Sequence, residues 1–489
     1  MFGRRTRGRL RRVEEAALVI AATALSGCSL MRVGPDYVPP EAATGAQWLD
    51  YKDPRLRGEE VDLSRWRSVF QDPVLDELVA GAVKQNLSLR VAGERIRAAR
   101  ARVRFALGNV FPQQQEAFGS VTGNRASSEA ANSIPGADVT TTDWQVGLSA
   151  GWEIDFWGVF HRAIEAADAE LKASVAEYDD ALVLMLSEVA RSFVLYRVFQ
   201  ERLVHVRRNL EVQQKSFELT QDKFKAGAVT ERDVQQAKQV LEQTRARIPA
   251  LEAGLRQASN ALCVLLGSPP SDLSATLGGG GGIPVVPTSV AIGIPADLLR
   301  RRPDVRRAER LAAAQSAQIG IAKGEYYPRF SISGTIGFRA DDASDLFRGS
   351  SSLAGSIGPS FRWNILHYGR IAALVEGEEA GFRARVAEFQ QTVLRAGQES
   401  DDAANLFLAA QDEASALAES VTASRRTVEI TLDQYAAGAI DFTPVFLFQA
   451  TLTEQEDALA VSRGQIALNL VALYRALGGG WEIRTHDGS

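Results

Sequence analysis

Apolar residues recur at every seventh position in the first half of the chain, between residues 159 and 226. This spacing predicts a coiled coil with a left-handed supercoil. No Gly or Pro interrupts residues 159–226, so a single helix about 100 Å long is expected at the usual rise per residue. The main seam comprises Val175, Leu182, Val189, Tyr196, Leu203, Leu210, Phe217 and Phe224, and the second seam comprises Leu171, Tyr178, Met185, Phe199 and Val206.

A sharp stop is expected after this helix, at the sequence Ala226-Gly227-Ala228. Glycine commonly ends a helix because it adopts the left-handed conformation without steric cost. A second helix is predicted to return from Thr230 to Leu265, with a possible kink at Pro249. The first half of the chain therefore predicts a long helical hairpin.

The same pattern returns in the second half at a constant offset of 211 residues, which predicts an internal tandem repeat. Residues 152–158 match 363–369, and residues 224–229 match 435–440. The boundaries that follow are 66–277 for repeat 1, 278–293 for a Gly/Pro-rich connector, 294–480 for repeat 2 and 481–489 for a C-terminal tail.

A second long helix is predicted over residues 370–437, followed by a turn at Gly438 and a return to Leu477. Glycines in its first part predict a less regular helix there than in the first arm. These glycines are Gly377, Gly381 and Gly397, and the seam positions are Val386, Val393, Phe407, Ala414, Val421, Val428 and Tyr435.

Four segments between the helices alternate apolar residues with small or polar ones. Each has about ten residues, the length of a tilted transmembrane strand, although a half-buried strand of a soluble sheet gives the same alternation. Aromatic residues near the strand ends are typical of a membrane interface. The segments are 115–123, 144–154, 329–338 and 353–363, and the aromatic residues are Trp152, Trp157, Trp363 and Tyr368.

A membrane location for these strands would require more than one chain. The sequence has no uninterrupted apolar run of ~18 residues, so any membrane span would have to be β-structure. Bacterial outer-membrane barrels begin at about eight strands, and four strands cannot close. Two chains would supply eight strands and three would supply twelve, and the sequence alone does not choose between them.

Residues 1–27 have the features of a secretory signal: several arginines, then a short apolar run from Ala16 to Leu25. The sequence ending at Cys28 resembles a bacterial lipobox, which implies cleavage before Cys28 and lipid on its thiol. Residues 28–65 would then form a lipid-anchored N-terminal segment, and Ser29 favours outer-membrane sorting by the same resemblance. A nucleic-acid-binding arm is the alternative explanation of the basic stretch.

Composition limits the chemistry that the chain can perform. The 4 His and 2 Cys leave little material for a metal site or a disulfide framework, and a net charge of −5 gives no basic footprint for nucleic acid. Residues 147–151 fit the esterase motif G-x-S-x-G, but Ser149 falls in the middle of a predicted strand rather than on a strand-to-helix turn. We predict no catalytic residue, no metal site and no cofactor.

Three stretches resemble the TolC/NodT-type outer-membrane factor family, a family of outer-membrane efflux lipoproteins. They are Val33–Pro40, Trp66–Arg100 and the motif Ile294–Glu309, which opens the second repeat. The resemblance covers essentially the whole mature chain.

The resemblance implies an α+β membrane protein that forms a homotrimer. Its parts would be a shared 12-stranded β-barrel in the outer membrane of a Gram-negative bacterium, a long periplasmic α-helical coiled-coil barrel and an equatorial belt. The implied function is the passive exit duct of a tripartite efflux pump for drugs or other small molecules. The implied partners are a periplasmic membrane-fusion adaptor, an inner-membrane pump of the RND type and outer-membrane lipid, without nucleic acid.

The resemblance also implies sites at the helical turns. The turns are expected to dock the adaptor, although the same residues are needed simply to make the turn. Relatives narrow the pore with acidic residues on the helix after the second turn, where the matching stretch of this chain, residues 443–447, has none. The nearest carboxylates are Asp441 and, in the first repeat, Asp233. The docking residues are Lys225, Ala226, Gly227, Ala228, Val229, Ala437, Gly438, Ala439 and Ile440, and the constriction residues are Asp233, Asp441, Thr443 and Leu447.

Two alternatives remain open from the sequence. The same channel could serve a type I protein-secretion system, since the substrate is expected to be chosen by the pump. A periplasmic coiled-coil lipoprotein with a soluble sheet and no pore would also carry the heptads and the signal segment.

Overall fold

The computed structural model describes residues 32–59, 63–127, 140–278, 281–293, 295 and 300–486. The predicted signal segment, residues 1–27, and the predicted lipidation site, Cys28, lie outside the described residues.

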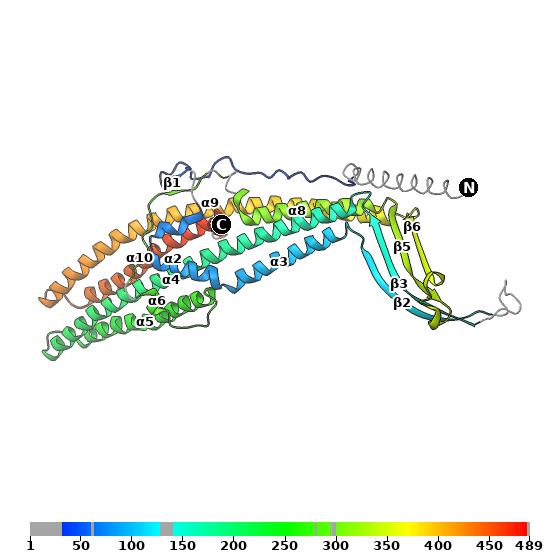
Figure 1. Cartoon of the computed structure of the whole chain (residues 1–489). Coiled ribbons are helices and arrows are strands. Elements are labelled where there is room, and N and C mark those ends of the chain that lie inside the picture. Colours follow the sequence, from blue (N-terminus) through cyan, green and yellow to red (C-terminus); the bar gives the residue numbers. More distant parts are fainter. Residues whose placement is uncertain are drawn as a thin grey trace, which may run out of the picture. The chain divides into compact units, whose positions relative to one another are not determined.

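Two long helical hairpins form as the heptads predict (Figure 1). Helices α4 (Val159–Lys225) and α9 (Arg370–Ala436) have 67 residues each. They are followed by the return helices α5 (Glu231–Leu265) and α10 (Thr443–Ala476). Helix α5 continues through Pro249 without ending.

The expectation of an irregular first part of α9 is wrong, because the helix runs unbroken through its glycines. At Gly381 the missing side chain has a packing role. A Cβ there would lie 2.9 Å from the side-chain nitrogen of Gln315 on the neighbouring helix. The glycine therefore leaves room for the Gln315 side chain without breaking the helix.

The remaining elements are shorter than these four helices, and they include the strands of two sheets. They are β1 (Leu56–Arg57), η1 (Leu63–Phe70), α2 (Pro73–Gln85), α3 (Leu87–Gly108), β2 (Gln114–Arg125), β3 (Thr140–Ile154), α6 (Ser274–Leu277), β4 (Val290–Ala291), α8 (Pro303–Gly324), β5 (Arg329–Ala340), η2 (Ala343–Asp345), η3 (Gly349–Ser351), β6 (Leu353–Arg362) and α11 (Ile483–His486).

Contacts divide the chain into two compact units. The sheet unit takes its described residues from 1–40, 97–173 and 308–388. The hairpin unit takes them from 41–96, 174–307 and 389–489. Each predicted repeat contributes to both units, because α4 and α9 begin in the sheet unit and continue in the hairpin unit.

The sheet unit contains the four predicted strands, paired antiparallel in the order β2-β3-β5-β6. The strands have 10 to 15 residues, so most are longer than predicted. Within the described part of the chain, one edge of β2 and one edge of β6 have no partner strand.

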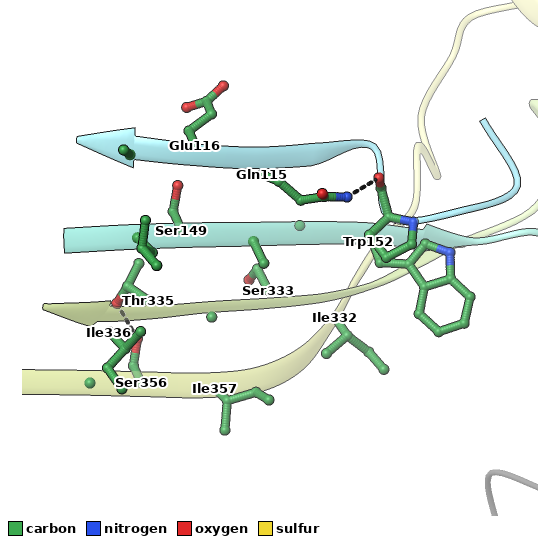
Figure 2. A pocket seen from close by; sticks show the side chains of 17 residues that line it. Gln115, Glu116, Ser149, Trp152, Ile332, Ser333, Thr335, Ile336, Ser356 and Ile357 are labelled. Carbon is green, nitrogen blue, oxygen red and sulfur yellow. Dashed lines mark hydrogen bonds between the residues drawn. The ribbon is translucent and has the colours of Figure 1, made fainter. Parts of the chain in front are cut away.

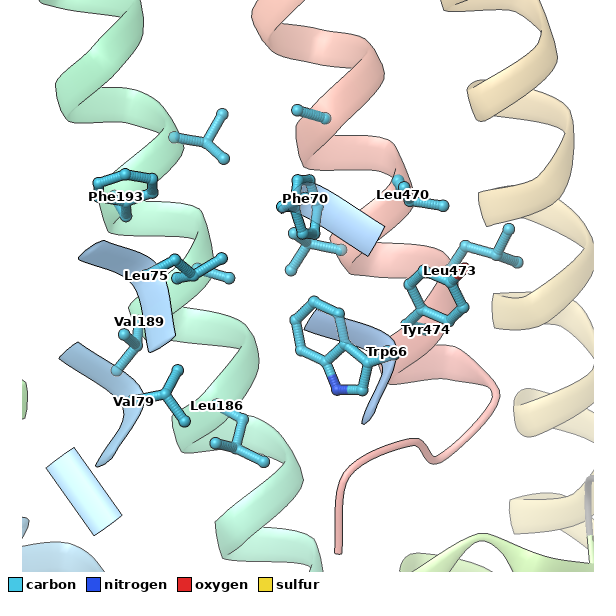
Figure 3. Close-up of a cluster of buried hydrophobic side chains, with 14 of the residues drawn as sticks. Trp66, Phe70, Leu75, Val79, Leu186, Val189, Phe193, Leu470, Leu473 and Tyr474 are labelled. Atoms are coloured by element: carbon cyan, nitrogen blue, oxygen red, sulfur yellow. The ribbon is translucent and has the colours of Figure 1, made fainter. Parts of the chain in front are cut away.

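The main core of the hairpin unit lies between α4 and α10, where η1 and α2 insert large side chains (Figure 3). Trp66 stacks on Tyr474 with ring centroids 5.6 Å apart, and Phe193 of α4 is fully buried. Burial of such aromatic side chains supplies much of the stability of a core. This core holds the two hairpins together.

The predicted seams are buried unevenly. The α9 seam is buried from Val393 to Tyr435, and Ala403 and Ala410 allow close approach. In α4 only the central part of the main seam is buried, and Phe224 at the tip is 44% exposed. Heptad spacing therefore located the seam correctly but not its ends.

Two side chains cap the return helices at equivalent places. Asn86 Nδ2 donates to the carbonyl of Leu265 (2.9 Å) at the end of α5. Arg302 Nη1 donates to the carbonyl of Ala476 (2.7 Å) at the end of α10. The motif that opens the second predicted repeat thus includes a buried arginine with a capping role.

The connector and the C-terminal segment are both docked onto the hairpin unit. Strand β4 of the connector pairs in parallel with β1. Arg484 in α11 contacts the buried carboxylate of Asp179 through two bonds of 2.7 and 3.3 Å. Burial raises the pKa of Asp179, and the contact with Arg484 opposes this effect.

Candidate functional site

The two faces of the sheet differ sharply in chemistry. Leu148 lies opposite Ala117 and Ile336 in the register, and these residues share the apolar face. The other face carries hydroxyl pairs such as Thr335 Oγ1 and Ser356 Oγ, which are 3.0 Å apart. A sheet with this division can lie between an apolar and an aqueous environment.

A hollow of about 740 Å³ lies against this sheet and is lined largely by apolar atoms. Figure 2 shows Ile332 and Ile357 pointing to one side of the strands and Glu116 and Ser149 to the other. Small residues in the lining, including Gly334, leave the hollow open between the larger side chains.

Three tryptophans join the ends of the strands to neighbouring backbone. The indole nitrogens of Trp152, Trp157 and Trp363 donate to the carbonyls of Val110 (3.1 Å), Pro328 (2.8 Å) and Tyr326 (3.0 Å). Each ring thus has its polar atom satisfied, as expected of aromatic residues at the level of a membrane interface. Tyr368 follows β6 and is 94% exposed.

Ser149 lies in the middle of β3, opposite Glu116 and Thr335. It therefore lacks the strand-to-helix turn of an esterase nucleophile. Among the residues that the structure describes, no group of three or more His, Cys, Asp or Glu side chains could hold a metal ion. No helix in the described ranges is long and apolar enough to cross a membrane.

Both helical turns use the same backbone motif. At the first turn, Ala228 N donates to Lys223 O (2.9 Å) and Gly227 N donates to Phe224 O (2.9 Å). Gly227 has φ +72°, so the motif is a Schellman helix end with glycine in the left-handed conformation. The bonds at Gly438, which has φ +75°, follow the same pattern.

The predicted docking residues divide into exposed and packed positions. Residues 225–228 and 437–439 are exposed, and Lys225 forms a surface ion pair with Asp222 (2.9 Å). Val229 and Ile440 instead pack against a cluster built around Tyr435 and Phe442. The structure thus brings the two turns together through one apolar cluster.

The predicted constriction residues have different environments. Asp233 is buried and accepts hydrogen bonds from the backbone N and the hydroxyl of Thr230 (2.9 Å each), which makes it part of a capping box at the start of α5. Burial alone would raise the pKa of Asp233, but these bonds, together with the neighbouring Arg232, outweigh it and lower the pKa.

The other three constriction residues are more accessible. Asp441 lies 3.5 Å from Arg232 of the first hairpin and accepts a bond from the Thr443 hydroxyl (3.4 Å). The Leu447 side chain is 53% exposed in the single chain. Neither acidic residue lies on α10 with Leu447, because Asp233 is in α5 and Asp441 precedes Thr443, the first residue of α10.

A buried row of polar contacts between α4 and the second hairpin was missed by the sequence reasoning. We call it the polar ladder. The sequence contains a signal for this ladder, because four polar residues of α4 follow heptad spacing. They are Asn209, Gln213, Ser216 and Thr220. The contacts are Asn209 Nδ2 to Glu456 (2.8 Å), Gln213 Nε2 to Thr453 (3.2 Å), Gln449 Nε2 to Ser216 (2.8 Å) and the Tyr435 hydroxyl to Thr220 (3.1 Å).

The chain belongs to the outer membrane efflux protein family, whose model matches residues 78–268 and 294–479. It is 32% identical over 472 residues to outer membrane protein OprJ of Pseudomonas aeruginosa, covering 96% of each protein. It is 30% identical over 462 residues to nodulation protein T of Rhizobium leguminosarum bv. trifolii, covering 94% of this chain and 95% of that one.

Solved structures of channels share the fold. The outer-membrane channel OprN superposes with a TM-score of 0.86 at 32% identity, covering 92% of this chain and 99% of that one. CusC superposes with a TM-score of 0.78 at 26% identity, covering 91% and 99%. The family assignment made from residues 33–40, 66–100 and 294–309 is therefore confirmed, and the family is one of channel proteins rather than enzymes.

Proposed function

We propose that this protein is the outer-membrane channel of a tripartite efflux pump. The observation that carries the proposal is the sheet, which has one apolar face, one polar face and two unpaired edges in the described part of the chain. Relatives bear names such as cation efflux system protein CusC of Escherichia coli and toluene efflux pump outer membrane protein TtgC of Pseudomonas putida. The substrate passes through the channel unchanged.

Three chains share one barrel of twelve strands in this proposal. Unpaired strand edges in a bilayer cost several kcal/mol for each unsatisfied backbone group, so β6 of one chain would pair with β2 of the next. That pairing would bring α9 of one chain beside α3 of its neighbour, since α3 leads into β2 and α9 follows β6.

Exposed residues on these two helices support this packing. Both helices carry outward rows at heptad spacing, a pattern that a neighbouring helix would bury. On α3 the row includes a phenylalanine that is 75% exposed, and on α9 it consists of small residues. The rows are Ala98, Ala101 and Phe105 on α3, and Ala373, Gly377, Ala380, Ala384 and Ala387 on α9.

The turns at Gly227 and Gly438 form the periplasmic end and dock a membrane-fusion adaptor. The support is their exposure together with their shared apolar cluster, which makes the two turns a single surface. Leu447, rather than a carboxylate, narrows the pore at this end. Cys28 carries the lipid, and an inner-membrane pump of the RND type supplies the substrate.

Expression in a Gram-negative strain that lacks its own efflux channel tests the function. With a cognate adaptor and RND pump, the protein is expected to restore drug resistance and lower drug accumulation. Export of a large protein substrate with type I components, without any effect on drug accumulation, would favour the secretion alternative. If neither drug resistance nor protein export appears despite normal expression, both the efflux function and the secretion alternative are contradicted.

A further inference from the structure

The inner strands of the sheet pair their charged side chains within the chain. Arg339 of β5 donates to the Asp143 carboxylate of β3 (2.8 Å), and Arg329 of β5 lies 4.0 Å from Glu153 of β3. These residues are all the charges that β3 and β5 carry, and the register places them on the polar face. Each inner charge therefore has an opposite charge on the neighbouring strand.

The edge strands carry one charge each on the same face, and neither charge is paired. Glu116 lies on β2, where it points to the polar side (Figure 2), and Arg362 is the last residue of β6. Both residues are exposed, and neither has an ion-pair partner among the residues that the structure describes. Two strands and about 14 Å separate β2 from β6. The two edges thus present opposite charges to a neighbouring sheet.

Strand length and side-chain direction restrict how these edges can pair between chains. β6 has 10 residues and β2 has 12, so full antiparallel pairing of β6 allows three registers. The middle one would place the polar face of one strand beside the apolar face of the other, because a slip of one residue reverses every side chain. The two remaining registers set Arg362 opposite either Gln114 or Glu116.

The apolar face distinguishes these two registers. When Arg362 lies opposite Glu116, Phe361 lies opposite Ala117, and an apolar pair accompanies the charge pair. In the other register Phe361 would lie opposite Gln115, and Arg362 would face an uncharged amide. Opposite charges and apolar pairs directly across two strands are stabilising. Both faces therefore favour the register that joins Arg362 to Glu116.

This register also gives an ordinary barrel geometry. Within one chain Gly355 is level with Ala117 across the sheet, whereas between chains it would lie opposite Gly123, about six residues further along β2. Six residues rise ~20 Å while four strand spacings cover ~19 Å, so the strands would tilt by about 45°. Strands of outer-membrane barrels have a tilt close to this value.

We propose that Arg362 of each chain forms an ion pair with Glu116 of the next chain, and that this pair fixes the register in which the chains close the barrel. The strands need such a device because both edges contain several glycines and small residues, which specify a register weakly. The proposal rests on the proposed function, because it assumes that three chains share one barrel.

Charge exchange in the full chain tests the ion pair. Glu116→Arg and Arg362→Glu each place like charges at every interface, so each should speed dissociation of the trimer in SDS at least about tenfold. The double variant Glu116→Arg/Arg362→Glu restores opposite charges and should dissociate within about twofold of the native rate. The control Glu116→Arg/Arg125→Glu has the same net charge but should stay fast, because Arg125 lies at the other end of β2.

Disulfide formation between chains tests the register without changing any charge. Ser356→Cys combined with Thr122→Cys places two thiols directly opposite in the proposed register, at a Cα separation that suits a disulfide. Ser356→Cys combined with Ser120→Cys does so in the alternative register. Oxidation should link the chains at least about tenfold faster in the first variant, because diagonal positions lie further apart. The three single-cysteine variants control for the natural cysteines.

Fast dissociation of the double charge variant, or native rates for both single reversals, would overturn the ion pair. Faster linking through position 120 would overturn the register, even if the charge variants fail to fold. If the native protein is monomeric and does not conduct ions, the proposed function fails instead. A conducting native trimer whose double charge variant does not recover rejects only the ion pair.

Discussion

The two hairpins end their long helices in the same way but start their return helices differently. Both turns close with a glycine in the left-handed conformation and the same pair of backbone bonds. Helix α5 then starts with a polar capping box, made by Thr230 and Asp233. Helix α10 begins at Thr443, directly after Phe442, which offers no side-chain cap and is fully buried.

This difference shows that one backbone turn can be held by two kinds of force. The start of α5 is fixed by local hydrogen bonds. The start of α10 is fixed by burial, with Phe442 packed edge-on against Tyr435 at a centroid distance of 5.2 Å. The start of α5 should therefore respond to pH, and the start of α10 should respond to the size of the side chain at position 442.

The largest expected effect comes from removing the apolar support of the second turn. Phe442→Ala should lower the local stability of the tip by about 3–5 kcal/mol, the usual cost of deleting a buried phenylalanine. Hydrogen exchange of the first amides of α10 measures this change. The control is Glu231→Ala, at the equivalent position of the first hairpin, which should change exchange little because Glu231 is exposed.

Removing the cap of the first hairpin should have a smaller effect. Asp233→Ala should lower the stability of the first turn of α5 by about 0.5–2 kcal/mol. Hydrogen exchange of that turn is the measurement, and α10 should exchange as in the native protein. Equal loosening of both return helices would contradict the separation of the two supports.

The same carboxylate should make the first hairpin sensitive to acid. The pKa of Asp233 is lowered in the folded state, so its stabilisation is complete above the unfolded pKa and is lost as the pH falls through the folded pKa. Exchange of the first turn of α5, corrected for intrinsic rates, should increase as the pH falls below about 4, the unfolded pKa of an aspartate. Asp233→Asn should abolish that increase, and a persistent increase would assign it to another group.

Replacing either of the two turn glycines should lower the stability of the protein by the same modest amount. Gly227→Ala and Gly438→Ala should each cost about 1–2 kcal/mol, because both glycines are left-handed. A Cβ added at either position would have no neighbour within 4 Å, so no steric clash adds to this cost. Thermal melting of the two variants measures the cost. A much larger loss in one variant would reveal a contact specific to that turn.

The smallest effect on stability, but a visible effect on transport, is expected at Leu447. Its side chain is half exposed in the single chain, so Leu447→Ala should change melting little. If apolar packing between chains closes the pore, the variant should increase the leak of a large antibiotic. Unchanged permeability would remove Leu447 from the constriction.

Much of the fold followed from the sequence because it depends on local periodicity. The heptads predicted α4 and α9 to within a residue or two, and period-two alternation located β2, β3, β5 and β6. Strand ends were less accurate, because pairing with a longer neighbour extends a strand beyond its own pattern. The polar ladder was overlooked because polar residues at heptad positions look like a solvated helix face until a second helix covers them.

The candidate sites could be predicted less completely from the sequence, because their chemistry depends on contacts between distant segments. Asp233 was considered for the constriction from its place after the turn, but one of its carboxylate oxygens accepts both bonds from Thr230 and the other faces Arg232. The burial of Arg162 under residues 33–36 has no signature in either segment alone. Such contacts become visible only when the fold brings the two segments together.

The conductance of the purified native protein tests the central claim most directly. Detergent-extracted protein should have the mass of three chains, and single molecules should produce one uniform conductance step in a planar lipid bilayer. A trimer that conducts would support a pore shared between chains. A monomeric product that dissolves without detergent and does not conduct would contradict it and favour a coiled-coil lipoprotein without a pore.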